Sequence, residues 1–508
     1  MAKHTRKRHR GGSSPKLAGQ GTYGCGFMPP LSCSYNTTKR TNTFSKLMQN
    51  NVNRGNNSSV IKEVDAIYKL RTIDPTFKYS LYPALDEDIP GASNTFQVRA
   101  KTFKKCRPRQ NNISKYAAEL SKCKLIDKPI NTSKYVILQS PYGGDSLLTY
   151  IAQLKTEFNM DKFINLLLSV DNLFEGLLEF HKNYFYHMDI KLPNIVVNTT
   201  SINLETRFID FGISIDLHNS NDKIYTSLYS QPYFAWPFEL NFYNKNISAV
   251  PKYTIAPILN KFYTDSLEYN INSHIIPYNN YIDNRTGRYI YNADNVYPIL
   301  QSIKSEPQSY YFQKTDIYSM GIIINAIIYN VLGIILYYKL DAGGNKIDIP
   351  SILVPGTHSF VALDSLSADK HPNIFFIRKF IEKCGMDILL FADKLVSFDP
   401  TKRYSTIEAY TKYKELCDTL KANKSYIELP QLPKNSQSIV SKVVNTVSSF
   451  FAQPSPPPPP MPPTAWMQSK NHTAINVKSK KLNHITIPVQ PIQTRGPARL
   501  PGKRYSKP

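Results

Sequence analysis

The sequence predicts an α+β fold with two lobes, a small lobe that is mainly β with one helix and a large lobe that is mainly α. Before residue 140 the pattern gives strand-like alternation and one helical segment. A buried-strand run, Tyr135 to Leu138, then leads to the turn Gly143-Gly144, which indicates a hinge. Beyond this turn, long segments of helical periodicity dominate. The hinge therefore separates the two predicted lobes.

A glycine-rich turn lies near the start of the small lobe. In LAGQGTYGCGF, the residues Gly19, Gly21 and Gly24 have the spacing GxGxxG. Glycines at this spacing let bare backbone N–H groups approach phosphate groups closely. The motif alone is weak evidence, because three glycines near a terminus also form an ordinary flexible turn.

A lysine and a glutamate follow in a predicted strand and a predicted helix. TFSKLM places Lys46 in a short alternating segment, and SSVIKEVDAIYKLRTI places Glu63 among apolar residues at helical spacing. Such a pair holds the lysine against the α- and β-phosphates of a nucleotide. Lys62 is a rival, since VIK also has the form of a strand motif. We prefer Lys46 because Lys62 lies in the helical pattern beside its would-be partner.

The stretch YHMDIKLPNIVV carries the chemistry that organises the chain. It contains the pattern HxDxKxxN, formed by His187, Asp189, Lys191 and Asn194, and a DFG tripeptide begins sixteen residues later at Asp210. A carboxylate at Asp189 can orient an attacking hydroxyl, and Lys191 can reach a transferring γ-phosphate. Asn194 and Asp210 offer hard oxygen ligands of the kind that Mg²⁺ prefers. The order and spacing of these groups indicate phosphoryl transfer.

The large lobe is expected to be built on helices. Residues 160–187 predict one amphipathic helix that leads to His187. A second helix is expected to begin at Asp316 and Ser319, polar residues suited to capping backbone groups. It would continue through Gly321 to Tyr338, eighteen residues without a charge, which is near the minimum for a membrane span. Its Asn and Gly residues favour a core helix instead, so no membrane span is expected.

Two further features concern distant parts of this lobe. We expect Glu239 in YFAWPFEL to form a bidentate ion pair with Arg403 in SFDPTKRYS, because such a pair ties distant segments together. Residues 240–312, rich in Asn, Tyr and Ile, are predicted to be an insertion. A second insertion is predicted at about 77–133, where the sequence is irregular and basic.

Composition places much of the positive charge at the two ends of the chain. The net charge of the 508 residues is +24. Residues 1–10 carry five Lys or Arg and residues 429–508 carry eleven, both without an acid. Such ends are expected to be disordered and to suit nucleic acid or an anionic surface, although they equally suit solubility alone.

The cysteines and the N-terminal sequence give information about the cellular compartment of the protein. Six cysteines are scattered without a CxxC pair, so the sequence predicts neither a zinc site nor a disulfide framework, and a reducing compartment fits best. No apolar run follows the charges of MAKHTRKRHRGGSS, which argues against a secretory signal.

The domain prediction follows these shifts in composition. We assign residues 1–16 to a basic disordered leader, residues 17–420 to one domain with lobes at 17–140 and 141–420, and residues 421–508 to a tail. The tail has a predicted short helix at 436–452 and then PSPPPPPMPP. This run makes a stiff spacer or a ligand for an aromatic-lined groove, and the spacer is preferred.

Taken in order, these motifs resemble the eukaryotic-type serine/threonine protein kinases, over roughly residues 17–420. The resemblance implies the two-lobed protein-kinase fold, ATP and Mg²⁺ as cofactors, and protein substrates. It implies catalytic roles for Asp189 and Lys191, and metal ligation by Asn194 and Asp210. The implied nucleotide contacts are Ala18, Gly19, Gly21, Gly24, Lys46, Glu63, Leu138, Gln139 and Ser140. The implied structural residues are His187, Gly212, Glu239, Asp316 and Arg403.

The sequence also departs from the family pattern at three positions. Met188 stands where an arginine normally precedes the catalytic aspartate, which removes a guanidinium that would bind a phosphorylated activation loop. We therefore predict activity without phosphorylation of Thr226 or Ser227. Gly26 stands where a valine usually packs on adenine, and Phe238 replaces the proline of the APE segment.

The function predicted from the sequence is an ATP-dependent serine/threonine protein kinase. The alternatives are a pseudokinase scaffold on the same fold, which the three departures favour, and a small-molecule or lipid kinase of related fold. FMPPLSC, FSK and IDP are similar to segments of kinases of giant, mimivirus-like DNA viruses. This narrower resemblance implies a viral protein in the host cytoplasm or the virion, not a secreted one.

Overall fold

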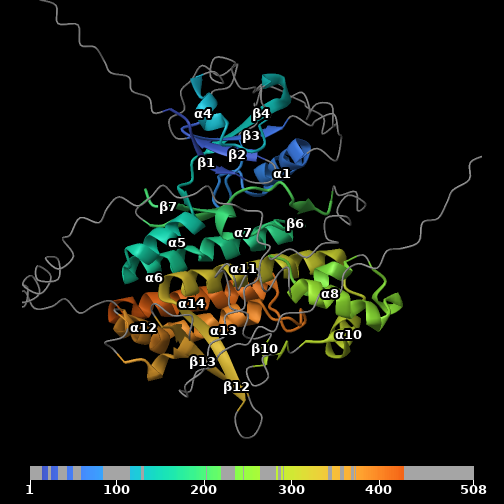
Figure 1. Ribbon diagram of the computed structural model, residues 1–508, viewed down its shortest axis with the longest axis vertical. Coiled ribbons are helices and arrows are strands. Elements are labelled where there is room, and N and C mark those ends of the chain that lie inside the picture. The colour runs from blue at the N-terminus through green and yellow to red at the C-terminus, as the bar shows by residue number, and fades with distance from the viewer. Residues whose placement is uncertain are drawn as a thin grey trace, which may run out of the picture.

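The structure is a computed structural model, in which a small lobe containing a sheet lies above a larger helical lobe (Figure 1). The predicted α+β class is confirmed by a sheet in the N-terminal part and helices in the later part. The structure describes residues 14–20, 24–31, 43–49, 59–83, 115–126, 131–201, 203–218, 235–243, 245–263, 282–283, 288–289, 291–340, 346–354, 360–367, 371 and 373–427.

The small lobe contains a four-stranded antiparallel sheet in the order β1-β2-β3-β4. Its elements are β1 (Lys16–Gln20), β2 (Gly24–Met28), β3 (Thr43–Gln49), β4 (Tyr135–Pro141) and one long helix, α1 (Ser59–Ile73). Lys46 pairs with Gly26 on one side and Leu138 on the other, so all three face the same side of the sheet. Met48 lies on this inner face and shares an apolar cluster with Val60 of α1.

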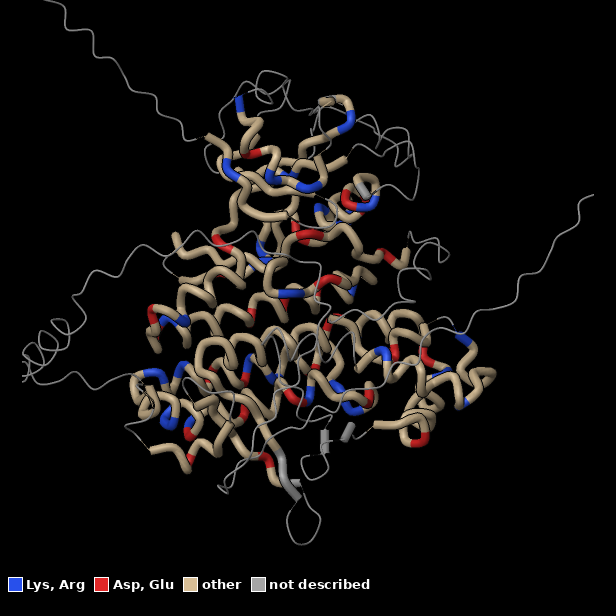
Figure 2. Tube along the Cα trace, viewed as in Figure 1, with Lys and Arg blue, Asp and Glu red and all other residues tan. Residues whose placement is uncertain are grey.

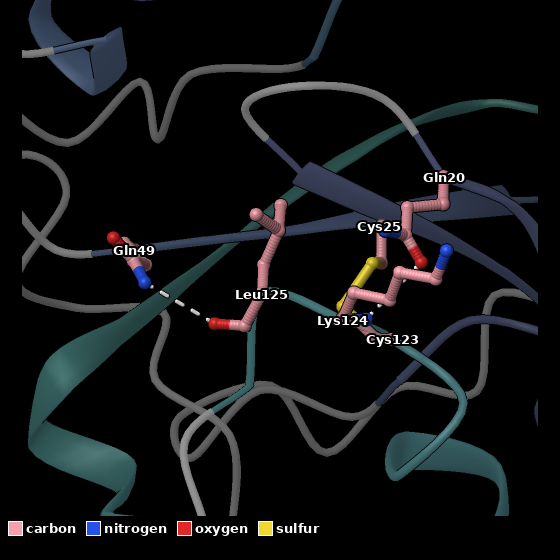
Figure 3. Close-up of a disulfide and its surroundings, with 6 residues drawn as sticks. All are labelled: Gln20, Cys25, Gln49, Cys123, Lys124 and Leu125. Atoms are coloured by element: carbon pink, nitrogen blue, oxygen red, sulfur yellow. Dashed lines mark hydrogen bonds between the residues drawn. A yellow bond between two sulfur atoms is a disulfide. The ribbon is translucent and has the colours of Figure 1, made fainter. Parts of the chain in front are cut away.

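The outer face of the sheet is covered by residues 115–126, which include α4 (Ala117–Leu120). The buried thiol groups of Cys25 on β2 and Cys123 form a disulfide there, with their Cα atoms 6.0 Å apart (Figure 3). Beside it, the side chain of Gln49 donates to the carbonyl of Leu125. The sequence predicted no disulfide framework, so the disulfide between these two cysteines is a correction. Its partners are 98 residues apart, so no local spacing pointed to it.

The first residues of the predicted 77–133 insertion belong to the junction of the lobes instead. The carboxylate of Asp74 accepts from the N–H groups of Tyr79 and Ser80, which shapes the turn after α1. Tyr79 then accepts from the N–H of Phe208, and Leu81 donates to the carbonyl of Phe208. These bonds attach residues 79–81 of the predicted insertion to the large lobe.

The large lobe is built from helices, with short strands on its upper side and further strands at its lower end (Figure 1). Its α-helices are α5 (Leu147–Thr156), α6 (Met160–Ser169), α7 (Asp171–Lys182), α8 (Ile255–Phe262), α10 (Ala293–Ser302), α11 (Gln308–Leu332), α12 (Ile374–Phe380), α13 (Met386–Leu395) and α14 (Thr406–Ile427). Its strands are β5 (Asp145–Ser146), β6 (Phe185–Tyr186), β7 (Ile195–Asn198), β8 (Glu205–Phe208), β9 (Ile215–Asp216), β10 (Ile282–Asp283), β11 (Arg288–Tyr289), β12 (Ile334–Leu340), β13 (Lys346–Leu353) and β14 (Phe360–Ala362).

The single helix predicted over residues 160–187 is two helices, α6 and α7, separated at Val170. Asn159 caps α6 by accepting from the N–H of Lys162. After α7, Tyr184 adopts a φ of 54° and the chain turns into β6, which leads to His187. The predicted apolar face packs in the large core, which also contains Phe380 and Tyr413.

The predicted apolar helix at 316–338 has different ends in the structure. Helix α11 begins at Gln308, so Asp316 lies in its middle rather than at its start. It ends at Leu332, where Gly333 has a φ of 69°, and the following IILYYKL forms strand β12 in a sheet with β13 and β14. By length and composition α11 could cross a membrane, but 89% of its most apolar window is buried inside the protein. It is therefore the core helix that was expected.

The predicted insertion at 240–312 is also partly integral to the lobe. A short 3₁₀ turn over Phe238–Phe242 forms a second apolar cluster together with α8 and α10. The cluster includes Tyr186 and Met188 of YHMDIKLPNIVV, which we call the catalytic stretch. Phe238 stacks on Phe398 in this cluster, with ring centroids 5.3 Å apart. Because α11 starts at Gln308, the last residues of the predicted insertion belong to the core helix.

The described part of the chain ends at Ile427 with α14, seven residues beyond the predicted boundary at 420. The basic leader up to residue 13, the helix predicted at 436–452, the proline run and the rest of the tail lie outside the described residues. Within the helical lobe, basic and acidic residues are interspersed, and neither kind dominates (Figure 2).

Candidate active site

The ammonium group of Lys46 joins the two lobes. Its Nζ atom lies 2.7 Å from Glu63 Oε2 on α1 and 2.7 Å from Asp210 Oδ1 in the large lobe. Strand β3 directs Lys46 to the inner face of the sheet, and the buried face of α1 presents Glu63, of which 4% is exposed. Gly212 lies against this pair, since a Cβ atom there would lie 3.1 Å from Glu63 Oε2. The lysine preferred over Lys62 is thus the one placed in the site.

The charges at this junction shift each other's protonation. Burial alone would disfavour the ammonium form, but the carboxylates of Asp210 and Glu63 outweigh it and raise the pKa of Lys46 above its ordinary value. Burial likewise disfavours an ionised Asp210, but Lys46 and then Lys191 outweigh it and lower the pKa of Asp210. The site therefore holds a charged lysine and an ionised aspartate at neutral pH.

The catalytic stretch folds around the carboxylate of Asp189. Its Oδ2 atom accepts from Lys191 Nζ at 3.0 Å and from Asn194 Nδ2 at 2.8 Å. Asn194 Nδ2 also donates to the backbone carbonyl of Asp189, which closes the loop. The backbone carbonyl of Asn194 then accepts from the N–H of Ile209, the residue before Asp210. The side chains of Asp189, Lys191 and Asn194 are therefore gathered in one place, next to the residue that precedes Asp210.

The oxygen atoms of Asn194 and Asp210 fit a magnesium ion. Asn194 uses its amide nitrogen within the loop, which leaves the oxygen as the atom of its side chain suited to a cation. Asp210 presents a carboxylate whose side chain is 33% exposed. A carboxylate and an amide oxygen are the hard ligands that Mg²⁺ takes beside waters and phosphates. Among the described residues there is no group of three or more His, Cys, Asp and Glu that could hold a metal by itself.

Two residues of this site have unusual backbone conformations. Met188 has a φ of 62° and Asp210 a φ of 65°. Non-glycine residues in this region cost on the order of 1–3 kcal/mol, and they persist where the surrounding structure imposes them. Met188 directly precedes Asp189, and Asp210 is itself a residue of the candidate site, so the strain lies within the site.

The buried carboxylate of Asp316 imposes the conformation at Met188. Asp316 Oδ2 accepts from the N–H of His187, and Oδ1 accepts from the N–H of Met188, both at 2.8 Å. His181 on α7 supports the same carboxylate, with its Nε2 3.1 Å from Oδ2. Asp316 thus caps backbone groups as predicted, but those of the catalytic stretch rather than those of its own helix.

The side chain of Met188 fills an apolar position. It is fully buried in the second apolar cluster, which contains Trp236 and Phe238. The indole N–H of Trp236 donates to the backbone carbonyl of Met188 at 2.7 Å. Tyr225, Thr226 and Ser227, in the loop before Trp236, lie outside the described residues.

The predicted ion pair between Glu239 and Arg403 is present, but it is not bidentate. Arg403 Nη1 donates to Glu239 Oε1 at 2.6 Å, and both side chains are buried. Glu239 Oε2 is buried without a hydrogen-bond partner among the described residues. The remaining guanidinium hydrogens bind the backbone carbonyls of Ser397 and Lys314, which explains why the fork does not face the carboxylate squarely.

The predicted nucleotide contacts divide between the two faces of the sheet. Leu138 and Ser140 on β4 lie on the inner face with Lys46. Gln139 points to the outer face, where it donates to the carbonyl of Leu31, so only its backbone is available to a nucleotide. Ala18 and Gly19 lie on β1 and Gly24 on β2, while Gly21 in the turn between them lies outside the described residues.

Sequence reasoning did not identify Trp236 and His181, which hold the catalytic stretch through Met188 and Asp316. The only sequence signal for Trp236 was its place beside Pro237-Phe238-Glu239, and the only one for His181 was a histidine on the buried face of a helix. Both contacts join segments far apart in the chain, so a local pattern could not reveal them.

Comparison with known proteins agrees with this geometry. Residues 101–308 match the family model described as "Protein kinase domain". This part of the chain is therefore similar to a protein kinase domain. The matched range includes Asp189, Asn194 and Asp210 but begins after β3 and α1, so Lys46 and Glu63 are placed in the site by the structure alone.

Two curated relatives are similar over part of the chain. They are "Calcium-dependent protein kinase 4" of Plasmodium berghei (strain Anka) and of Plasmodium falciparum (isolate 3D7). Each is 28% identical over 141 residues, which are 27% of this chain and 26% of the relative. The chain thus spans about a quarter of the length of these relatives.

Proposed function

We propose that the protein is a serine/threonine protein kinase that transfers the γ-phosphate of ATP to hydroxyl groups of protein substrates. The observation that carries the proposal is the Lys46 ammonium bound at 2.7 Å to both Glu63 and Asp210. Kinase activity needs the lysine–glutamate pair and the DFG aspartate in place together. Here the ammonium group of Lys46 binds both Glu63 and Asp210.

The chemistry follows from the positions of the side chains. Asp189 orients the substrate hydroxyl and accepts its proton, while Lys191 beside it stabilises negative charge on the transferred phosphoryl group. Lys46 holds the α- and β-phosphates. A magnesium ion held by Asn194 and Asp210 would neutralise phosphate charge. Asp316 and Trp236 keep the catalytic stretch in position from two sides.

The choice of serine and threonine rests on Lys191. A lysine two residues after the catalytic aspartate resembles the serine/threonine class, and the similarity to two protein kinases supports a protein substrate. The match covers too little of those relatives to transfer any dependence on calcium.

Labelled ATP and a panel of basic proteins, peptides and lipids provide the test. We expect transfer of label to serine and threonine in protein, and little to lipid. Asp210→Ala should abolish the transfer, because it removes a metal ligand and a partner of Lys46. Turnover that survives Asp210→Ala, or label found only in lipid, would contradict the assignment.

The second candidate function is a pseudokinase scaffold. The three departures from the family pattern, at Gly26, Met188 and Phe238, favour it. A scaffold would bind partners without turnover, so turnover decides between the two.

The origin, the localisation and the binding partners of the protein remain proposals. The relatives are Plasmodium proteins, so the comparisons do not support the viral resemblance. A place in the host cytoplasm or virion, nucleic-acid or anionic-surface binding by the basic ends, and a groove-type partner for the proline run stay predictions. Binding of the ends to nucleic acid would weaken steeply as salt rises.

A further inference from the structure

The inner face of the small-lobe sheet carries an aromatic ring over a glycine. A Cβ atom built on Gly26 would lie 2.1 Å from the Cζ atom of Phe44 and 2.8 Å from its Cε2 atom. Real Cβ atoms do not approach other atoms this closely, so the ring occupies the space that a side chain at position 26 would fill. Strand β2 therefore accommodates the ring only because residue 26 is glycine.

The strand register places this ring at the site. Gly26 pairs with Lys46, and Phe44 precedes Lys46 by two residues on β3, so all three lie on the inner face. Phe44 and Gly26 are diagonal neighbours across the two strands, a separation that an aromatic side chain spans. On the other side, Phe44 pairs with Ser140 and Lys46 with Leu138. The ring thus lies between the two strand segments predicted to contact a nucleotide.

The apolar side chain that the family pattern places on β2 is replaced here by an apolar side chain on the neighbouring strand β3. The family pattern has a valine on the strand after the glycine turn and a small alanine two residues before the lysine. Here these positions hold Gly26 and Phe44. Loss of the valine side chain alone would remove apolar surface from the inner face of the sheet, but the phenyl ring returns it. Phe44 is only half-buried, so the ring has surface left to contact a ligand.

We propose that Phe44 is the residue that holds the nucleotide base, by stacking of the base on its ring, and that Gly26 makes room for this ring. The inference rests on the proposed function, since it assumes that a nucleotide binds at Lys46. Stacking on an aromatic ring depends on the base and not on the phosphates. Phe44 should therefore contribute to binding of ATP but not to binding of its phosphate chain alone.

Calorimetric titration of the full chain with Mg·ATP, and separately with inorganic tripolyphosphate, tests this. Phe44→Ala should raise the Kd for ATP about tenfold or more, because loss of one base–aromatic stack has about this effect. The Kd for tripolyphosphate should not change. Phe375→Ala is the matched control, because Phe375 is an exposed ring on α12, outside the site, and should change neither value.

A double-mutant cycle tests the pairing with Gly26. Gly26→Val alone should weaken ATP binding, because its Cβ displaces the ring. The double variant Gly26→Val/Phe44→Ala should bind ATP no worse than either single variant, since an aliphatic roof replaces the aromatic one. If the increase in the Kd for ATP in the double variant equals the product of the increases in the two single variants, the coupling between Gly26 and Phe44 is overturned.

The remaining outcomes separate this inference from the proposed function. Wild-type protein that transfers phosphate, but whose ATP affinity is unchanged or improved by Phe44→Ala, overturns the role of Phe44 and leaves the kinase assignment standing. Equal losses for ATP and tripolyphosphate also overturn it, because they indicate a structural role. Wild-type protein that binds no nucleotide overturns both.

Discussion

Trp236 donates its indole N–H to the backbone carbonyl of Met188 across a distance of 2.7 Å. Asp316 accepts from the N–H of the same residue, so both backbone groups of Met188 are held within the large lobe. The methionine side chain is buried at the position where a guanidinium would bind a phosphorylated loop. The catalytic stretch is thus held by Trp236 and Asp316 at both backbone groups of Met188.

This arrangement predicts activity without phosphorylation of the loop before Trp236. Replacing Thr226 and Ser227 together by alanine should leave kcat within about twofold of the wild-type value, because no arginine precedes Asp189 to bind a phosphate there. Steady-state turnover of protein made without other kinases provides the measurement. A large loss of kcat in the double variant would refute the idea.

The ion pair of Glu239 and Arg403 should contribute strongly to stability. Glu239→Ala leaves a fully buried guanidinium without its counter-charge, which should lower the free energy of unfolding by about 3–5 kcal/mol. The control is Glu205→Ala, because Glu205 pairs with Arg207 near the surface, and there we expect about 1 kcal/mol or less. Urea unfolding of both variants gives the comparison, and equal losses would argue against this account.

Acid should destabilise the protein through His187. Burial lowers the pKa of His187 below its ordinary value of 6.5, although Asp316, Asp189 and Asp210 oppose the shift. The unfolded chain therefore takes up a proton as the pH falls through about 6.5, while the folded protein does not. Since the unfolded state then binds more protons, the free energy of unfolding decreases on acidification.

The variant His187→Phe isolates this effect, because a phenyl ring can keep the packing against Phe208 and Phe211. The free energy of unfolding, measured between pH 7.5 and 5.5, should fall less steeply with pH in the variant. The difference in slope should correspond to the uptake of up to about one proton on unfolding. Equal slopes in the two proteins would show that His187 is not responsible.

The disulfide between Cys25 and Cys123 should stabilise the small lobe. It closes a loop with a sequence separation of 98, for which the chain-entropy model gives about 4–5 kcal/mol. A reductant should therefore lower the Tm of the wild-type protein, and Cys25→Ser/Cys123→Ser should have a low Tm that no longer responds to it. Cys384→Ala is the control, because that thiol is buried and unpaired. A reductant effect that persists in the double variant would contradict the role of this disulfide.

The sequence predicted those parts of the site that depend on local order. The spacing within HxDxKxxN and DFG identifies the residues of these motifs. The alternation around Lys46 predicted a strand and the periodicity around Glu63 predicted a helix, and these two elements bring the pair together. In the apolar helix, periodicity indicated a buried helix but not its ends. The N-terminal end follows Pro307, and the C-terminal end depends on the single left-handed residue Gly333.

The remaining features depend on contacts between distant segments. The disulfide joins residues 98 apart, and Trp236 reaches Met188 across 48 residues of chain. Asp74 organises its turn through backbone hydrogen bonds that no spacing rule signals. The ring of Phe44 over Gly26 requires knowledge of strand register. Such relationships are set by the packed fold, so the sequence pattern could not reveal them.

The most direct test of the account is turnover of Mg·ATP by the wild-type protein beside Asp189→Asn. This substitution keeps the size of the side chain but removes the carboxylate that binds Lys191 and accepts the substrate proton. We predict that the wild-type protein phosphorylates serine or threonine, and that the variant loses at least about 10²-fold in kcat while it still binds ATP. Equal turnover by the two proteins, or no turnover by the wild-type protein, would contradict the account.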